Sequence, residues 1–453
     1  MSLLCWSVSV SAASVSEESL GHEWADRHQL VVITAEQASA HLSISDVTLM
    51  AVRSGRLESI PFQIDEVDQE GFVYFSETGI PHSGLQDVWD GLDELVFMLK
   101  DASPERLVRR GHNENVSSGA PGAVDTPVID ADIGKVLAEV STEFNNGVKG
   151  YVYLVQGEPS QGGGDYVRYD REAYVAESDW YRLTSRADNP IELQDLSYRD
   201  DRLPEASLLD TVKMWITGHS VGGVTQMTIT NRNFRAEVVD VKAGAIRANV
   251  QLKAQLSVAK IPIMNFWIKY QFTPSGLRAV SRAEIPNWMP MFLYRTSVGL
   301  SMDANDLRGS QVYAYSDSDQ LLVGEVDGEL SQAEVRMQSA ALSSENPWWM
   351  LVSPRNFQVL ARMKIPTQYE TPINLIYQDD VLLKVSPERY VGQLPNIGFQ
   401  VSRIPLKGVY TMVFDLYFDN VDSRLNPRAY VESKLTPTQY DWRWLTEHRQ
   451  LSD

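Results

Sequence analysis

The stretch Ile246–Val258, IRANVQLKAQLSV, decides the class of fold. Apolar and polar residues alternate strictly along it, and the apolar set is Ile246, Ala248, Val250, Leu252, Ala254, Leu256 and Val258. Successive side chains of a β-strand point to opposite faces of its sheet, so this segment predicts a long strand with one packed and one wet face. A helix would instead need apolar residues at every third or fourth position.

The same pattern recurs elsewhere in the chain. Phe266–Phe272 and Met412–Phe418 alternate in the same way, whereas Leu95–Leu99 is apolar on both faces and predicts a central strand. Convincing helical periodicity is scarce. We therefore expect an all-β protein built from antiparallel β-sandwiches, with a large sandwich or supersandwich and a smaller N-terminal one.

Two segments rich in glycine and proline suggest how the chain is divided. Ser103–Pro127 and Glu158–Asp165, which reads EPSQGGGD, have the composition of loops or linkers. The second is the expected boundary between an N-terminal β-sandwich domain at residues 24–158 and a large antiparallel β domain at 159–435. Residues 436–453 are aromatic and punctuated by proline, and we expect them to pack on the surface as a tail.

Residues 1–13 resemble a secretory signal peptide. Leu3–Ala13, LLCWSVSVSAA, is an apolar run that closes on small residues, as in the core and cleavage site of such peptides. The positive region that normally precedes the core is missing, which is consistent with a start codon further upstream. A buried strand is the alternative interpretation. The pattern predicts a periplasmic or extracellular protein, and cleavage would remove Cys5, the only cysteine.

Composition excludes several classes of partner. The 40 basic and 60 acidic residues give a formal charge of −20, so the protein would repel a phosphate backbone and nucleic acid is not an expected ligand. No stretch approaches the roughly 18 uninterrupted apolar residues of a transmembrane helix. No phosphate-binding glycine loop is present, so no nucleotide cofactor is expected.

One motif invites a hydrolase interpretation. Gly218–Gly222, GHSVG, matches the G-x-S-x-G of a nucleophile elbow, in which the serine lies between a strand and a helix. Here a β-branched strand pattern follows Ser220, and the only later histidine is His448. We interpret the motif as a turn between two strands.

Two acidic turns carry the oxygen ligands that Ca²⁺ prefers. Asp87, Asp90 and Asp93 lie in DVWDGLDE, and Asp65 and Asp68 lie in IDEVDQEG. Their spacing does not match the EF-hand loop, and solvated acidic turns are the alternative. Calcium is a candidate ligand on these five residues.

Two aromatic turns are candidates for ligand binding. Trp288 lies in PNWMPMF, and Trp348 and Trp349 lie in NPWWM. Exposed indole faces stack on sugar rings or anchor a lipid or protein surface. The alternative is that these rings fill the end of a sandwich core.

Three segments resemble a known family. Ile60–Asp68 (IPFQIDEVD), Asp93–Met98 (DELVFM) and Val241–Ala248 (VKAGAIRA) are similar to segments of secreted β-supersandwich proteins with galactose-mutarotase-like domains, some of them related to polysaccharide lyases. The resemblance implies a supersandwich architecture and a carbohydrate-facing context. None of the segments includes a catalytic residue that can be carried over, and such a fold does not fix a function.

Three functions stay open. The first is an exported ligand-binding or scaffold protein of the cell envelope that faces glycans, with envelope proteins as further partners. The second is a carbohydrate-active, polysaccharide-lyase-like enzyme, which would need a general base near an arginine or Ca²⁺. The third is an envelope partner that handles a lipid or other hydrophobic ligand through the Trp288 and Trp348 turns. The sequence leaves open whether the protein is an enzyme.

Overall fold

The computed structural model of the 453-residue chain describes fifteen segments, and every structural statement below refers to them. They are residues 28–107, 124–126, 135–144, 146–157, 164–198, 207–220, 225–291, 293–305, 307–343, 345–365, 371–381, 389–390, 394–404, 407–421 and 426–445. The expected signal peptide, residues 158–163 of the expected linker, and His448 lie outside these segments. The boundary near residue 158 therefore stays a prediction.

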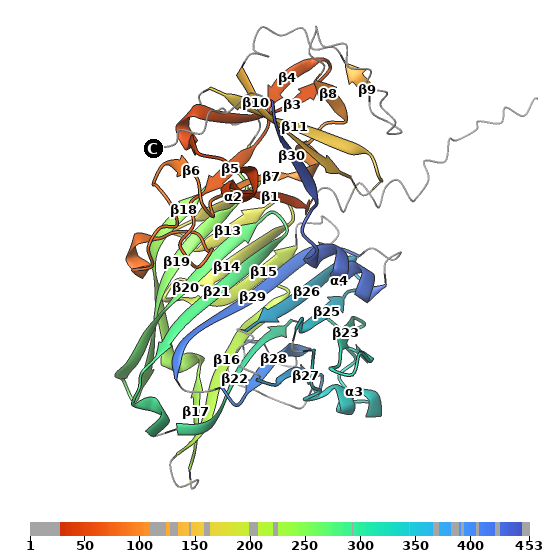
Figure 1. Ribbon diagram of the computed structural model, residues 1–453. Coiled ribbons are helices and arrows are strands. Elements are labelled where there is room, and N and C mark those ends of the chain that lie inside the picture. Colours follow the sequence, from red (N-terminus) through yellow and green to blue (C-terminus); the bar gives the residue numbers. More distant parts are fainter. Residues whose placement is uncertain are drawn as a thin grey trace, which may run out of the picture.

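The strands form several antiparallel sheets, which confirms the all-β fold (Figure 1). The exception is the short parallel pair of β8 (Glu105–Leu107) and β9 (Val124–Thr126). The helices are short, namely α2 (Ala35–Ala38), α3 (Gln332–Met337) and α4 (Pro427–Leu435). No described helix is long and apolar enough to cross a membrane.

The N-terminal unit is a small sandwich. One sheet has the order β30-β10-β11-β3-β4, with β30 (Tyr440–Trp444), β10 (Val136–Glu143), β11 (Lys149–Gln156), β3 (Val47–Arg53) and β4 (Arg56–Ser59). The other has the order β1-β7-β5, with β1 (Leu30–Thr34), β7 (Glu94–Met98) and β5 (Phe62–Asp65). Leu49, Val140 and Leu95 from the two sheets are fully buried in one core, as expected for stacked sheets.

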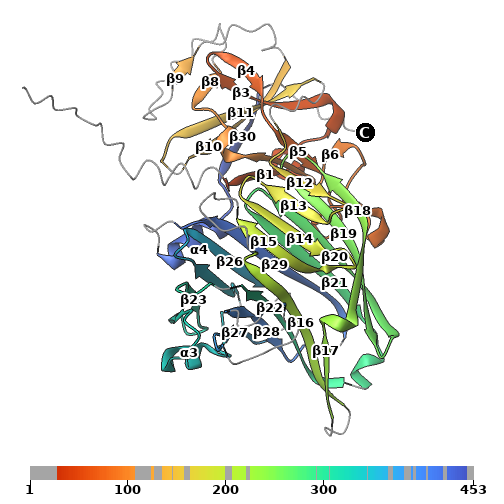
Figure 2. The ribbon, with the colours of Figure 1, turned by 180° about the vertical axis from the view of Figure 1, so that it is seen from behind.

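The C-terminal segment differs from the expected surface-packed tail. Strand β30 pairs with β10, opposite Ala138–Thr142, so it belongs to the sheet of the N-terminal unit. Its alternate residues Tyr440, Trp442 and Trp444 pack on that unit's core. The YDWRW alternation is itself a strand pattern, because every second residue is aromatic. In Figures 1 and 2 this strand runs up from α4 into the upper unit.

The large unit holds two facing sheets and a third beside them (Figure 2). The nine-stranded sheet has the order β18 (Phe234–Ala243), β19 (Ala248–Val258), β20 (Ile261–Thr273), β21 (Gly276–Ile285), β29 (Gly408–Asn420), β26 (Phe357–Lys364), β25 (Trp348–Val352), β23 (Gln311–Tyr315) and β24 (Leu321–Glu325). The five-stranded sheet has the order β17 (Gln226–Thr230), β16 (Leu209–Ser220), β22 (Leu293–Ala304), β28 (Asn396–Ser402) and β27 (Ile373–Gln378). The third comprises β12 (Val167–Asp170), β13 (Val175–Ser178), β14 (Tyr181–Arg186) and β15 (Asn189–Tyr198).

Strand β19 comprises all but the first two residues of the alternating stretch that predicted the fold. Its apolar side chains from Ala248 to Leu256 are buried in the large core. The opposite face is only partly wet, because Asn249 and Gln251 are also buried. Asn249 donates to Asp65 of the N-terminal unit at 3.3 Å. One end of the large sheet is therefore covered by the N-terminal unit.

The first three residues of the G-x-S-x-G motif, Gly218 to Ser220, end strand β16, and Val221 and Gly222 lie outside the described residues. Strand β16 ends at Ser220 and pairs antiparallel with β17. The Ser220 amide donates to the Thr225 carbonyl at 2.8 Å, which closes the hairpin. The next described element is strand β17, which begins at Gln226, whereas a nucleophile elbow has a helix after the serine.

Candidate ligand-binding cavity

A cavity of about 340 Å³ lies between the nine-stranded and the five-stranded sheets. Side chains from β20, β21 and β29 form one wall, and side chains from β16, β17 and β22 form the other. None of the residues that line it is charged, and most are Leu, Ile, Val, Met or Phe. Its size falls within the range of small-molecule sites, roughly 300–1,000 Å³.

Small residues on β21 explain why the space is open. The side chains that this central strand turns toward the cavity include Ala279, Ser281 and Ala283. Their neighbours on β20 and β29 are large, since Ala279 lies between Tyr270 and Phe414. A sheet that places small residues opposite another sheet leaves an unfilled volume there, because the backbones stay about 10 Å apart.

The cavity is deep at one end and open at the other. On β20, Ile268 and Tyr270 are 6% exposed, whereas Met264 is only partly buried. On β29, Leu416 is 1% exposed and Met412 is partly buried. Apolar side chains between two sheets become fully buried where the sheets meet. The sheets therefore close toward the N-terminal unit and separate toward the opposite end.

The open end is bordered by an aromatic turn. Trp288 and Met289 precede β22 and line the cavity, and Met289 begins the 3₁₀ turn η6 (Met289–Met291). Trp288 is 43% exposed and Met291 is 68% exposed. Exposed large apolar side chains beside an apolar opening are typical of a ligand entrance.

Two hydroxyl groups in the wall are paired within the protein. The Tyr270 hydroxyl donates to the Ile191 carbonyl at 3.2 Å, and the Thr296 hydroxyl donates to the Ile404 carbonyl at 2.8 Å. Burial raises the pKa of Tyr270 above its ordinary value, so this phenol stays neutral. The wall therefore presents apolar surface and few free hydrogen-bonding groups.

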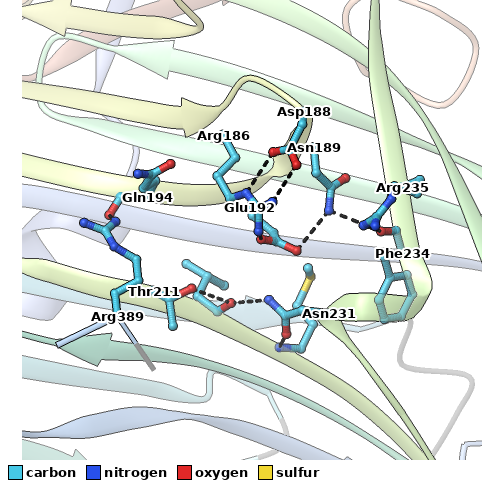
Figure 3. Close-up of polar contacts among 12 residues, drawn as sticks. Arg186, Asp188, Asn189, Glu192, Gln194, Thr211, Asn231, Phe234, Arg235 and Arg389 are labelled. Carbon is cyan, nitrogen blue, oxygen red and sulfur yellow. Dashed lines mark hydrogen bonds and ion pairs between the residues drawn. The ribbon is translucent and has the colours of Figure 1, made fainter. Parts of the chain in front are cut away.

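Two buried asparagines fix one side of the wall (Figure 3). Asn231 accepts from the Met214 amide and donates to the Val212 carbonyl, each at 2.7 Å. Asn189 donates to the Phe234 carbonyl at 3.2 Å. Met214, Val212 and Phe234 all line the cavity. Because their backbone is tied by buried side chains, this part of the wall is formed before any ligand binds.

Trp348 and Trp349, the other two tryptophans considered for ligand binding, are core residues. They begin strand β25, opposite Arg362 and Ala361 of β26. Trp349 is 3% exposed and packs in the large core, and Trp348 is 7% exposed and packs with Tyr430 of α4. Neither ring presents a face to a ligand. Core packing, the alternative left open by the sequence, is what the structure shows for this pair.

The five acidic residues considered for calcium do not converge on one point, and most of them bind partners within the protein. Asp65 accepts from Arg247 at 3.2 Å, and Asp68 pairs with Lys269. Within the part of the chain that the structure describes, no group of three or more His, Cys, Asp or Glu side chains is arranged to hold a metal ion.

The remaining three acids belong to the turn before β7. Asp93 is buried and accepts from the Val67 amide at 2.8 Å. Asp90 accepts from the Leu85 amide at 3.2 Å, and Asp87 is exposed. These bonds shape the turn, and calcium binding by these residues stays an open hypothesis.

A cluster of charged groups lies where the two units meet. Arg247 of the large unit contacts Asp65 at 3.2 Å and Glu94 at 2.5 Å in the N-terminal unit. The adjoining cavity, bordered by Glu94, Lys269 and Arg278, holds about 30 Å³. That is room for about one water molecule and not for a sugar ring. The cluster therefore acts as a joint between the units, in the sense of a buried ion-pair contact that connects them.

Sequence reasoning missed most of the cavity. It identified Trp288 at the opening and the strands that form the walls, but not the space between them. The available signal was the run Leu277–Ile285, in which Ala279, Ser281 and Ala283 occupy one face. Small residues at alternate positions of a central strand indicate an unfilled face.

Comparison with known proteins gives a weak structural resemblance. No protein-family model matches the sequence, and no curated protein matches it. The chain is similar to an alpha-mannosidase from Enterococcus faecalis V583, with 12% identity and a TM-score of 0.44 over 89% of this chain and 41% of that one. It therefore spans less than half the length of that protein.

Two further solved structures belong to the groups that the sequence segments resemble. One is a galactose mutarotase-like protein from Lactobacillus casei ATCC 334, with 11% identity and a TM-score of 0.32 over 54% of this chain and 99% of that one. The other is the heparan sulfate lyase HepC from Pedobacter heparinus, with 9% identity and a TM-score of 0.25 over 41% of this chain and 22% of that one. At these TM-scores the likeness carries no argument about ligand or activity.

Proposed function

We propose that this protein is an exported binding protein for an extended hydrophobic ligand, such as the acyl chain of a lipid, held between its two large sheets. The observation that carries the proposal is the uncharged cavity of about 340 Å³ that opens beside Trp288. The lining residues of β21 run from Leu277 to Ile285, which is about 26 Å at about 3.3 Å per residue.

Elementary energetics support an apolar occupant. A cavity of about 150 Å³ lined by apolar side chains stays dry and binds benzene, so this larger one favours a longer hydrocarbon over water. Each methylene group transferred from water contributes roughly 0.8 kcal/mol. Because the asparagines fix part of the wall, little ordering accompanies binding.

The chemistry of the lining supports binding over catalysis. None of the cavity's lining residues is Asp, Glu, His, Lys, Arg or Cys. The remaining candidates for a general acid or base are the tyrosines Tyr270 and Tyr410, and burial raises the pKa of Tyr270, which disfavours its ionised form as a base. A sugar would also find few partners for its hydroxyl groups there, since most lining residues are apolar. The hydrophobic-ligand function is the best supported of the three considered, and the glycan-facing role stays a prediction.

A pair of neighbouring substitutions tests the proposal. Ala283 lines the cavity, whereas Glu284, the next residue of β21, is exposed. Ala283→Trp should fill the open end, and Glu284→Trp adds the same ring on the other face. Binding of the neutral fluorophore N-phenyl-1-naphthylamine, and its displacement by dodecanol, would be measured for both variants.

We expect binding by the wild type and by Glu284→Trp, and at least tenfold weaker binding by Ala283→Trp. Thermal melts would show whether the added indole has unfolded the protein, since overpacking costs roughly 1–3 kcal/mol. Equal binding by both folded variants would overturn the proposal, and so would a wild type that binds neither compound.

Export is the second part of the proposal, and it rests on the apolar run Leu3–Ala13. N-terminal sequencing of the protein made from its native locus would test it. The mature chain should begin near Ala13 or Ser14, and an intact Met1 on a cytoplasmic protein would contradict export.

A further inference from the structure

Two arginines border an open depression at the mouth of the apolar cavity. The depression is lined by Arg295, Thr296, Arg403 and Ile404. Thr296 and Ile404 also line the apolar cavity, so the two spaces share a wall. The two arginines thus lie beside residues that border the apolar cavity.

Irregularities of two neighbouring strands place these arginines there. The pairing of β22 with β16 contains a β-bulge. Two residues of β22, Arg295 and Thr296, lie opposite a single residue of β16, Gly218. On the other side, the Ile404 amide donates to the Thr296 carbonyl at 3.2 Å, so Arg403 stands between this bond and the last pair of β28. Thr296 is thus flanked by one displaced arginine on each side. Bulges commonly redirect a side chain at a functional site.

Both arginines adopt a backbone conformation that such residues seldom use. The φ angle is 50° for Arg295 and 59° for Arg403. Positive φ is rare for residues other than glycine and is unfavourable for bulky ones. Strain of this kind persists where the surrounding structure imposes it, and it clusters at ligand-binding positions.

The two guanidinium groups have no acidic partner among the described residues. Both side chains are exposed, and the contact recorded for Arg295 is with the ring of Tyr294, at 5.9 Å from its centre. Other exposed arginines are paired, as Arg428 is with Asp319 at 3.2 Å, and others such as Arg336 have no ion pair in the described part of the chain. What distinguishes Arg295 and Arg403 is therefore that they line the same depression. In a chain of net charge −20, two unpaired cations that face one depression form an anion-binding feature.

We infer that the ligand is an anionic amphiphile, whose hydrocarbon chain occupies the cavity and whose carboxylate or phosphate head lies between Arg295 and Arg403. The inference rests on the proposed function, because it assigns a head group to the ligand of the same cavity. Guanidinium groups donate paired hydrogen bonds to carboxylate and phosphate oxygens, which suits both heads.

The test compares ligands that differ only in the head group. Dodecanoate and dodecanol would displace N-phenyl-1-naphthylamine from the wild type at pH 8 and low salt. Two exposed ion pairs contribute up to about tenfold in affinity, so we expect dodecanoate to bind roughly tenfold more tightly than dodecanol. The ratio should fall as salt is added, because exposed charges are screened.

Variants assign the preference to these side chains. The double variant Arg295→Gln, Arg403→Gln should bind dodecanol as the wild type does and lose the preference for dodecanoate. The double variant Arg295→Lys, Arg403→Lys should retain much of the preference for dodecanoate. Arg336→Gln, at an exposed position of α3, is the matched control and should change neither affinity.

The outcomes separate the two proposals. Equal binding of acid and alcohol by the wild type, or a preference that survives the double Gln variant, would overturn the head-group inference and leave the hydrophobic cavity intact. Absence of binding for both ligands would instead refute the proposed function.

Discussion

Asp93→Asn is expected to stabilise the N-terminal unit at neutral pH. The Asp93 side chain is fully buried in the turn before β7, and burial raises its pKa from 3.8 to about 6. The folded state thus holds this proton more tightly than the unfolded state does. The stabilising contribution is fully present below about pH 4 and is lost as the pH rises through about 6.

The magnitude follows from the shift. A change of about two pKa units corresponds to roughly 3 kcal/mol at neutral pH, as an upper bound. Asparagine removes this cost, and its carbonyl oxygen can still accept from the Val67 amide, which lies 2.8 Å from Asp93. The weaker contact of the Asp90 amide, at 3.5 Å, would be lost. We therefore expect a net gain of about 1–2 kcal/mol at pH 7.

Urea titrations between pH 4 and 8 measure this gain. The indole N–H of Trp89 donates to the Asp93 carbonyl at 3.1 Å, so tryptophan fluorescence reports on the turn. His82 lies 4.0 Å from the carboxylate, so the comparison is repeated with His82→Gln. Asp87→Asn, at an exposed position, is the control. Parallel stability curves of the wild type and Asp93→Asn across this range would show that folding does not raise the pKa of Asp93.

Three further predictions concern the ligand, the joint between the units and calcium. Lengthening a linear alcohol should lower its dissociation constant roughly fourfold per methylene until the cavity is full, and a flat series in displacement assays would contradict a hydrocarbon site. Arg247→Met should destabilise the protein by about 3–5 kcal/mol in urea titrations, because Asp65 and Glu94 lose a buried partner; an unchanged midpoint would refute the role of the joint. Thermal melts in calcium and in chelator should superimpose, since Asp65 and Asp68 already pair with basic residues, and a rise in Tm with calcium would instead support the metal site.

Strand positions could be predicted from the sequence because period-two alternation is a local property. Ile246–Val258 and Met412–Phe418 form the strands β19 and β29 that their patterns indicate. Period-two alternation does not indicate how close the facing sheet lies to a given residue. Met412 and Leu416 have the same place in the alternation, yet one is partly buried and the other is 1% exposed.

The candidate site was harder to predict because it depends on residues that are distant in sequence. Trp288 was identified from its own turn, but Trp348 and Trp349, which look alike in sequence, are covered by neighbouring elements. Arg295 and Arg403 line one depression only because β22 pairs with β28, more than a hundred positions further along the chain. No local pattern marks either arginine, since a bulge is defined by the register between strands.

The pairing of β30 with β10 has a consequence for how the protein is made. Residues 440–444 leave the ribosome after the whole of the large unit. One edge of β10 therefore has no partner strand while some three hundred further residues are synthesised. An exposed strand edge is a template for pairing with other chains. Such a nascent chain must be protected from association with other chains until β30 has been synthesised. A polypeptide truncated before Tyr440 would retain the unpaired edge of β10 permanently.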